Sequence, residues 1–298
     1  MTAAPDILCI GSVLWDLIGR APVAMRQGSD VPGRITRVPG GVAMNIAMAL
    51  ARFDVTPALL SAIGDDDDGR ALCAAAQRRR IVTDHIYVSP DLPTDRYIAV
   101  EGANGLIAAI ADAHSLETAG DKILSSLADG RLGSAAMPYG GKIALDGNLN
   151  EELLARIAGS PLFAAADLRL APASPGKAER LMPLLRHPRA TIYVNLEEAG
   201  LLGHRPFDDA ASAASALIAR GARRVLVTDG GAASALGQQG ADVITAAPRK
   251  VMVTRVTGAG DTFMAAHIAA EIRGMIGARA LDFALDAAAT YVSGELPL

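Results

Sequence analysis

The fold of this chain is decided by the stretch TGAGDTF at residues 257–263. A β-like run, residues 251–256, precedes it, and Met264, Ile268 and Ile272 then recur at helical spacing. The glycines therefore open a helix, where small residues let backbone N–H groups approach an anion and the helix dipole adds positive potential. The pattern predicts a phosphate site at this helix start.

Asp261 stands in the first turn of that predicted helix, beside any bound phosphate. A phosphate repels a carboxylate placed there, so its presence indicates a function, such as taking a proton from an attacking hydroxyl. The motif alone leaves a second interpretation open, in which the glycines form a turn and Asp261 is an ordinary helix cap.

Outward from this stretch, apolar runs typical of strands alternate with segments of helical spacing. Strands are predicted at residues 7–10, 58–63, 142–146, 162–167, 191–195 and 224–228. Helices are predicted at residues 41–53, 69–80, 151–158, 177–185, 207–219, 260–275 and 279–292. The alternation indicates an α/β fold with a mostly parallel central sheet and helices on both faces.

Two regions break the alternation, because Pro and Gly interrupt residues 19–38 and short alternating pieces fill residues 85–111. Such pieces are typical of hairpins. We expect one domain over residues 1–298, with a small β lid inserted as segments at about 12–38 and 85–112. The alternative is a set of edge strands with no moving role.

The composition excludes several classes of protein. The 298 residues are 51% hydrophobic with a net charge of -4, which excludes a disordered chain and argues against binding to a nucleic acid polymer. Cys9 and Cys73 cannot form a disulfide framework. No apolar run is long enough for a membrane span and the start lacks a signal-peptide pattern, so a cytoplasmic protein is expected.

Two further motifs lie early in the chain. Gly40 and Gly41 open a predicted helix, and Asn45 lies one turn in, where its amide suits sugar hydroxyls. Ser12 and Asp16 come directly after the first strand, at the sheet edge where α/β proteins bind ligands. Each motif alone also fits a tight turn or an exposed loop.

Two later motifs also lie at strand ends. Asn195 is followed by Glu198, which could hold water around Mg²⁺ because that ion uses few direct carboxylates. Thr228 and Gly230 offer a hydroxyl and a glycine N–H group to phosphates.

Taken in order from about residue 7 to residue 292, these motifs resemble the ribokinase-like (PfkB) family of carbohydrate and nucleoside kinases. The resemblance implies a ribokinase-like three-layer α/β/α fold and transfer of the γ-phosphate of ATP to a hydroxymethyl group. It implies that Asp261 is the catalytic base and that Gly258, Ala259 and Gly260 form the anion hole. A Walker A loop is absent, which argues against a P-loop kinase.

The resemblance also implies the remaining site residues. The sugar is expected at Ser12, Asp16, Gly40, Gly41 and Asn45, and ATP at Asn195, Thr228, Gly230, Gly258 and Gly260. Glu198 is expected to hold Mg²⁺ through water. Lids of this family often pair, so a homodimer through the lid is expected.

One departure concerns the approach to the glycine motif. Family members that use a monovalent cation commonly have Asp-Thr-Thr or Asp-Thr-Asn there, whereas this chain has Arg255-Val256-Thr257. The departure makes K⁺ activation doubtful, although loop carbonyls could still serve.

Four short matches resemble pseudouridine kinases more than ribokinases. They are GGVAMNIA at 40–47, VTGAGD at 256–261, Tyr97-Ile98 with NGLIAAIAD at 104–112, and Pro172-x-Ser174-x-x-Lys177. The resemblance implies 5′-phosphorylation of pseudouridine, with the base held by Tyr97, Ile98 and Ile110. Ribokinase or another sugar kinase is the alternative, fructose 6-phosphate is less favoured, and a non-catalytic binding protein is a third hypothesis.

The run Asp65–Asp68 and the five histidines carry no chemistry in this interpretation. Four carboxylates suggest a metal site, but aspartates also favour a helix start. The histidines lack zinc-ligand spacing, and His267 is expected to be a packed or surface residue.

Overall fold

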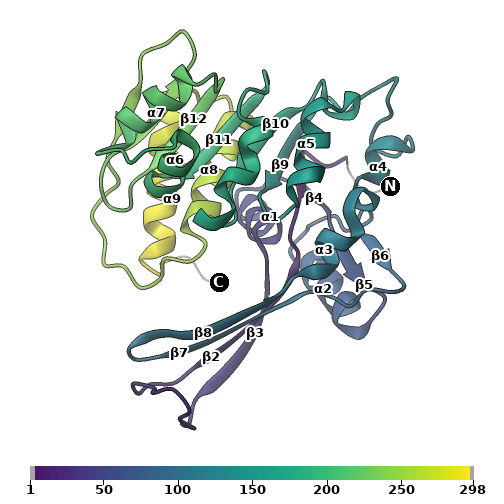
Figure 1. Ribbon diagram of the computed structural model, residues 1–298, viewed down its shortest axis with the longest axis vertical. Helices are drawn as coiled ribbons and strands as arrows, with labels where there is room; N and C mark the ends of the chain where they lie inside the picture. Colours follow the sequence, from purple (N-terminus) through teal and green to yellow (C-terminus); the bar gives the residue numbers. More distant parts are fainter. Residues whose placement is uncertain (1–3, 296–298) are drawn as a thin grey trace.

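The computed structural model describes residues 4–295 and has three layers, with a central sheet between two layers of helices (Figure 1). The sheet has eight strands in the order β14 (Ile244–Ala246), β13 (Ser234–Gln238), β12 (Arg224–Thr228), β11 (Ala190–Asn195), β10 (Asp167–Ala171), β9 (Lys142–Asp146), β1 (Ile7–Ile10) and β4 (Pro57–Leu60). The strands from β12 to β4 are parallel, and β13 and β14 add an antiparallel edge. The expected ribokinase-like α/β/α architecture is confirmed.

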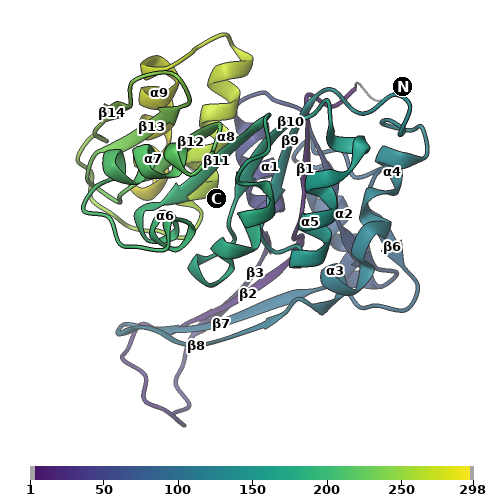
Figure 2. The same ribbon diagram turned by 45° about the horizontal axis from the view of Figure 1, so that its top comes forward.

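The two helix layers pack against opposite faces of this sheet (Figures 1 and 2). One layer holds α1 (Val42–Arg52), α8 (Ala259–Ile272) and α9 (Ala278–Val292). The other holds α5 (Glu151–Gly159), the 3₁₀ helix η3 (Pro175–Leu184), α6 (Leu196–Gly203) and α7 (Ala210–Ala219). Side chains of β1 alternate between the two cores, as the two-residue period of a strand requires.

Beyond β4, smaller elements extend the molecule. They are β5 (Ala62–Gly64), α2 (Asp67–Gln77), β6 (Tyr87–Ser89), α3 (His114–Ala119), the 3₁₀ helix η1 (Gly120–Leu124) and α4 (Ser125–Ala128). Strands β5 and β6 form a separate two-stranded parallel sheet. The predicted strand at 58–63 is thus divided between two sheets, and Ser61, whose hydroxyl donates to the Gly11 carbonyl, lies at the division.

Two strand predictions are wrong. Residues 162–167 do not form a strand: Pro161–Phe163 is a 3₁₀ helix, η2, because Pro161 fits a first helical position and the Ser160 hydroxyl caps the Leu162 N–H. Strand β10 begins only at Asp167. Residues 251–256 form a loop with exposed apolar side chains, and the sheet edge is instead the hairpin of β13 and β14.

A second sheet projects from the main body (Figures 1 and 2). Its four strands, in order, are β3 (Arg34–Gly40), β2 (Leu14–Arg20), β7 (Arg96–Gly102) and β8 (Gly105–Asp112). We call these strands the projecting sheet. Strand β3 continues to Gly40, so the sheet joins the glycine pair directly, whereas residues 85–95 lie outside it.

Strand register divides the projecting sheet into two faces, since paired residues share a face. Asp16 pairs with Val38 and with Tyr97, and we call this side the Asp16 face. Leu17 pairs with Ile98, which pairs with Ile110, and we call this side the Ile98 face.

The base of the Ile98 face packs against the start of α2. The Arg37 guanidinium lies 3.8 Å from the Trp15 ring, and Arg37 and Arg96 form ion pairs with Asp68. Across residues 4–295, no helix has the length and apolar character that crossing a membrane requires.

Candidate active site

The predicted site residues converge on the carboxyl edge of the main sheet. Gly11 and Ser12 follow β1, Asp146 ends β9, and Asn195 at the end of β11 pairs with Thr228 at the end of β12. Parallel strands end at the same edge, so segments far apart in the sequence meet there.

The two glycine motifs meet through one hydrogen bond. The Asn45 amide, on α1, donates to the Asp261 carboxylate, on α8, at 3.0 Å. Gly258 precedes α8 with φ at 86°, in the left-handed region, and a Cβ there would lie 2.6 Å from the Tyr291 hydroxyl. Glycine is therefore required at the helix start. The Ala259 N–H donates to the Val256 carbonyl at 3.0 Å, so of the three predicted anion-hole groups those of Gly258 and Gly260 are the ones without an acceptor within residues 4–295.

Asp261 is set up to hold and release a proton near neutral pH. Burial raises the pKa of its carboxyl to about 7; the Asn45 hydrogen bond opposes this shift, and the charges of Asp146 and Glu198 add to it. A general base works best when its pKa lies near the operating pH. The helix-cap interpretation has no support here, since Gly258 is the capping residue and its helix has no side-chain cap.

Asp146 is a buried carboxylate that sequence reasoning missed. It accepts hydrogen bonds from the N–H groups of Ser12 (2.8 Å), Ala43 (3.0 Å) and Asn148 (2.7 Å). Burial raises its pKa and these hydrogen bonds lower it. A Cβ on Gly11 would lie 2.3 Å from this carboxyl group, so Gly11 leaves the room that Asp146 occupies.

Ser12 belongs to the same network. Its hydroxyl donates to Asp146 at 3.1 Å and accepts from the Val42 N–H and the Asn148 amide, both at 2.8 Å. A hydroxyl has one donor and two lone pairs, so all three are used. Ser12 therefore supports the loop and has no bond left for a sugar.

Asp16 and the glycine pair lie together at the root of the projecting sheet. A Cβ on Gly40 would lie 2.0 Å from the Asp16 carboxylate, and one on Gly41 would lie 2.4 Å from the Ser12 carbonyl. Burial raises the pKa of Asp16 to about 6. Within residues 4–295 no hydrogen bond or ion pair engages this carboxylate, which leaves its oxygens for hydroxyl groups.

Asn195 and Glu198 form a reciprocal cap at the start of α6. The Asn195 side chain accepts from the Glu198 N–H, and the Glu198 carboxylate accepts from the Asn195 N–H, both at 2.8 Å. One Glu198 oxygen is thus engaged, while burial raises the pKa of the group. Gly230 borders an open space, because among the described residues a Cβ there would meet no atom within 4 Å, and the nearby Thr228 hydroxyl donates to the Val194 carbonyl at 3.5 Å.

Oxygen ligands and unbalanced negative charge make this edge suitable for a hard cation. Asp146, Glu198 and Asp261 form no salt bridge within the described residues, and the first two raise the pKa of the third through their charge. These features fit Mg²⁺, which keeps several waters and takes few carboxylates. Among residues 4–295, His, Cys, Asp and Glu side chains form no group of three able to hold a metal directly.

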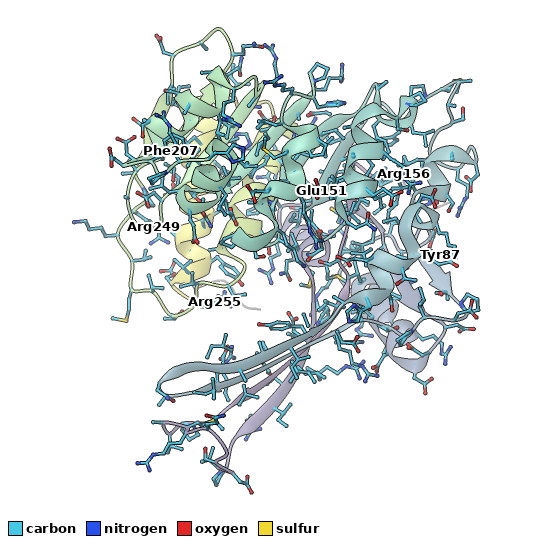
Figure 3. All side chains as sticks on the ribbon, in the orientation of Figure 1. Tyr87, Glu151, Arg156, Phe207, Arg249 and Arg255 are labelled. Atoms are coloured by element: carbon cyan, nitrogen blue, oxygen red, sulfur yellow. The ribbon has the colours of Figure 1, made fainter. Side chains whose placement is uncertain are left out.

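The loop before α8 contacts Tyr291 of α9. The Thr257 carbonyl accepts from the Tyr291 hydroxyl at 2.8 Å, and the Arg255 guanidinium lies 4.1 Å from the Tyr291 ring. Figure 3 shows Arg255 on the side of the main body that faces the projecting sheet.

The three predicted base contacts do not share a face. Tyr97 lies on the Asp16 face, whereas Ile98 and Ile110 lie on the Ile98 face and are 43% and 67% exposed. Tyr97 and Ile98 are adjacent in the sequence, but side chains of adjacent residues in a strand point to opposite faces of the sheet. Tyr97 alone of the three shares a face with Asp16.

The aspartate run at residues 65–68 has a structural role. Asp66 caps α2 through the Gly69 N–H, Asp65 and Asp67 pair with Arg70, and Asp68 holds the projecting sheet. His267 is packed in the interior of the protein, with its ring 2.8 Å from the Tyr193 hydroxyl.

Comparison with known proteins agrees with this geometry. The pfkB family carbohydrate kinase model matches residues 4–296. A pseudouridine kinase of Escherichia coli (strain K12) is 27% identical over 97% of this chain and 91% of that relative.

Two solved structures share the fold. A carbohydrate kinase from Agrobacterium tumefaciens has a TM-score of 0.80 at 24% identity, with 96% of this chain and 90% of that chain covered. Arabidopsis thaliana ribokinase complexed with ribose and ATP has a TM-score of 0.77 at 20% identity, with 99% and 94% covered. With its family match over nearly the whole length, the chain belongs to the pfkB family of carbohydrate kinases, phosphotransferases whose acceptor is an alcohol group.

Proposed function

We propose that this protein is an ATP-dependent nucleoside kinase that converts pseudouridine to pseudouridine 5′-phosphate. The observation that carries the proposal is the contact between Asn45 and Asp261, which joins the expected sugar-binding helix to the expected catalytic base. The similarity to the Escherichia coli pseudouridine kinase supports the choice of substrate.

In the proposed reaction the 5′-hydroxyl oxygen attacks the γ-phosphorus of ATP. Asp261 takes the hydroxyl proton, the new P–O bond forms as the bond to the bridging β–γ oxygen breaks, and ADP leaves. The N–H groups of Gly258 and Gly260 face the transferred phosphoryl, and the Ala259 N–H joins them by exchanging its bond to the Val256 carbonyl for one to the phosphoryl. Asp16, Gly41 and Asn45 orient the sugar, and Asn195, Thr228 and Gly230 border the ATP phosphates.

Mg²⁺ would supply positive charge to the phosphates during transfer. Glu198 would hold it through water with the carboxylate oxygen that the cap leaves unengaged. The residues before α8 argue against a K⁺ requirement, and equal activity in sodium and potassium buffers is the expected result.

The substrate is tested by ADP release with pseudouridine, uridine, ribose, adenosine and fructose 6-phosphate. We expect the highest kcat/KM with pseudouridine. Faster turnover of ribose would instead identify a ribokinase or another sugar kinase of the family. Binding of a nucleoside without ADP release from any of the five would favour the non-catalytic hypothesis.

The pH dependence of the reaction should report Asp261. Its carboxyl must be ionised to accept a proton, and burial raises its pKa to about 7, so kcat/KM is expected to rise with pH through this value. Asn45→Ala removes the hydrogen bond that lowers this pKa, so the midpoint should move to higher pH. A flat profile from pH 5 to 8 for the wild type would contradict the role of Asp261.

The Ile98 face is proposed as the contact between two copies of the chain. Ile35, Ile98 and Ile110 are 78%, 43% and 67% exposed on one side of a thin sheet, an apolar surface that a second copy would cover. When two identical sheets pair about a two-fold axis, each sheet covers the exposed apolar side chains of the other.

We expect Ile98→Asp with Ile110→Asp to convert a dimer to a monomer in sedimentation velocity. The matched control is Ile276→Asp, which changes an isoleucine that is 78% exposed elsewhere and should leave the dimer intact. A wild-type protein that is monomeric at all concentrations would reject the contact.

A further inference from the structure

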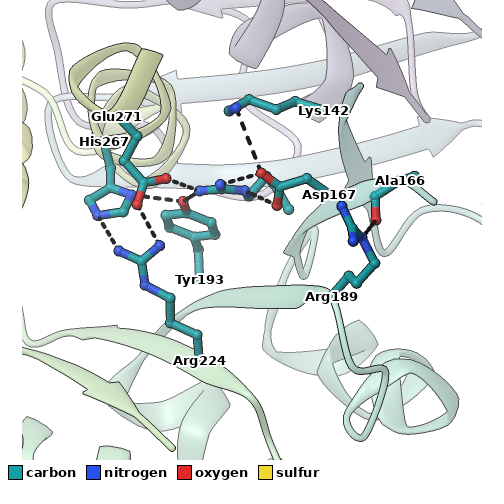
Figure 4. Close-up of polar contacts among 9 residues, drawn as sticks. Lys142, Ala166, Asp167, Arg189, Tyr193, Arg224, His267 and Glu271 are labelled. Atoms are coloured by element: carbon teal, nitrogen blue, oxygen red, sulfur yellow. Dashed lines mark hydrogen bonds and ion pairs between the residues drawn. The ribbon is translucent and has the colours of Figure 1, made fainter. Parts of the chain in front are cut away.

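A second cluster of charged side chains lies at the opposite, amino-terminal edge of the main sheet. Figure 4 shows its centre, where side chains of β10, β11, β12 and α8 meet. Arg169 bonds to Asp167, Glu271 and the Tyr193 hydroxyl, and Arg224 bonds to Glu271. None of these residues takes part in the proposed reaction.

Positive charge exceeds negative charge in this cluster. Asp167 is already neutralised, since it accepts two hydrogen bonds from Arg169 and lies 3.7 Å from the Lys142 amine. Glu271 is shared by Arg169 and Arg224. Burial lowers the pKa of His267 to about 3, so that ring adds no charge at neutral pH.

Two more arginines face the same place from neighbouring loops. Arg189 and Arg223 are exposed; Arg189 donates to the Ala166 carbonyl at 3.3 Å, and Arg223 approaches Gln239 at 3.5 Å. Neither forms a salt bridge within residues 4–295. Like charges gathered without a counterion repel one another.

These side chains line one cavity. It has a volume of about 290 Å³. Its border includes Thr191 of β11 and the charged side chains of Asp167, Arg169, Arg189, Arg223 and Arg224. Within residues 4–295 the Nε–H group of Arg224 is buried without a hydrogen-bond acceptor, which costs free energy.

We propose that this cavity is a second anion site, which binds inorganic phosphate or a small phosphate monoester. Phosphate oxygens suit several convergent guanidinium groups, because each oxygen accepts a charge-assisted hydrogen bond. The anion supplies the missing negative charge. The site is separate from the catalytic edge, since strands of five residues span about 16 Å.

Helix α8 connects the two edges. His267 and Glu271 lie near its end, while Asp261 and the anion-hole glycines lie at its start.

Isothermal titration calorimetry with inorganic phosphate tests the site directly, in the presence of a saturating non-hydrolysable ATP analogue whose γ-phosphate covers the anion hole at the catalytic edge. We expect inorganic phosphate to bind the second site with a dissociation constant on the order of 1 mM or tighter. Arg189→Gln with Arg223→Gln should weaken it at least about tenfold. Both positions are exposed, so the variant should fold, and an unchanged melting temperature verifies this.

The matched control is Arg279→Gln, an exposed arginine on α9, which should bind phosphate as the wild type does. Tighter binding of ribose 5-phosphate than of phosphate would identify a phosphate monoester as the occupant, and equal binding would identify free phosphate. An absence of heat above that of chloride at equal ionic strength would overturn the proposal. Equal affinities in the double variant and the wild type would overturn it too.

Discussion

Asp261→Asn is expected to lower kcat by about 10²- to 10⁴-fold and to leave nucleoside binding nearly unchanged. Asparagine preserves the shape of the side chain and cannot accept the hydroxyl proton. The hydrogen bond to Asn45 can persist through the amide oxygen. Steady-state kinetics and a direct binding titration separate the two effects.

The same variant should also be more stable relative to wild type at pH 8 than at pH 5. The folded pKa of Asp261 is about 7, above its ordinary value of 3.8, so folding favours the protonated form and stability falls as pH rises between these values. Asparagine does not ionise, so the variant does not lose this stability as the pH rises. The control is Asp282→Asn, an exposed aspartate on α9, which should retain full activity. Wild-type kcat in Asp261→Asn would exclude Asp261 as the base.

Asp146→Ala is expected to lower the free energy of unfolding by about 3–5 kcal/mol and to abolish measurable activity. The carboxylate accepts hydrogen bonds from the N–H groups of Ser12, Ala43 and Asn148, and its loss leaves these groups without their acceptor. The loop after β1 and the start of α1 would then separate, and Asn45 would lose its position beside Asp261. Urea unfolding measures the change in stability.

A carboxylate that caps an exposed helix provides the control for Asp146. Asp209 accepts the Ser212 N–H at the start of α7, and Asp209→Ala should cost only about 1 kcal/mol without affecting activity. A loss in Asp146→Ala no greater than that in Asp209→Ala would show that the buried network contributes little.

Local signals were sufficient for much of the fold. The strands at residues 7–10, 142–146 and 224–228 form with the predicted bounds, because each is a short apolar run with clear ends. The glycine motifs predicted both helix starts, since a left-handed or crowded backbone position leaves glycine as the suitable residue.

Long-range contacts were beyond sequence reasoning. Asp146 is the last residue of a buried strand, as Asn195 is, so its position was a signal, but its partners lie up to 134 residues away. Ser12 fitted a substrate contact until the structure showed its hydroxyl fully bonded. The faces of Ile98 and Ile110 depend on strand register, which their spacing does not give.

The junction at Gly40 and Gly41 has a mechanical consequence. Strand β3 ends at Gly40 and α1 begins at Val42, so a single peptide pivot joins the projecting sheet to the helix of Asn45. A Cβ on Gly40 would meet the Asp16 carboxylate and one on Gly41 would meet the Ser12 backbone, so both positions are closely packed. We propose that a tilt of the sheet would be transmitted to Asn45, and through its amide to Asp261, which would couple arrival of the acceptor to readiness of the base.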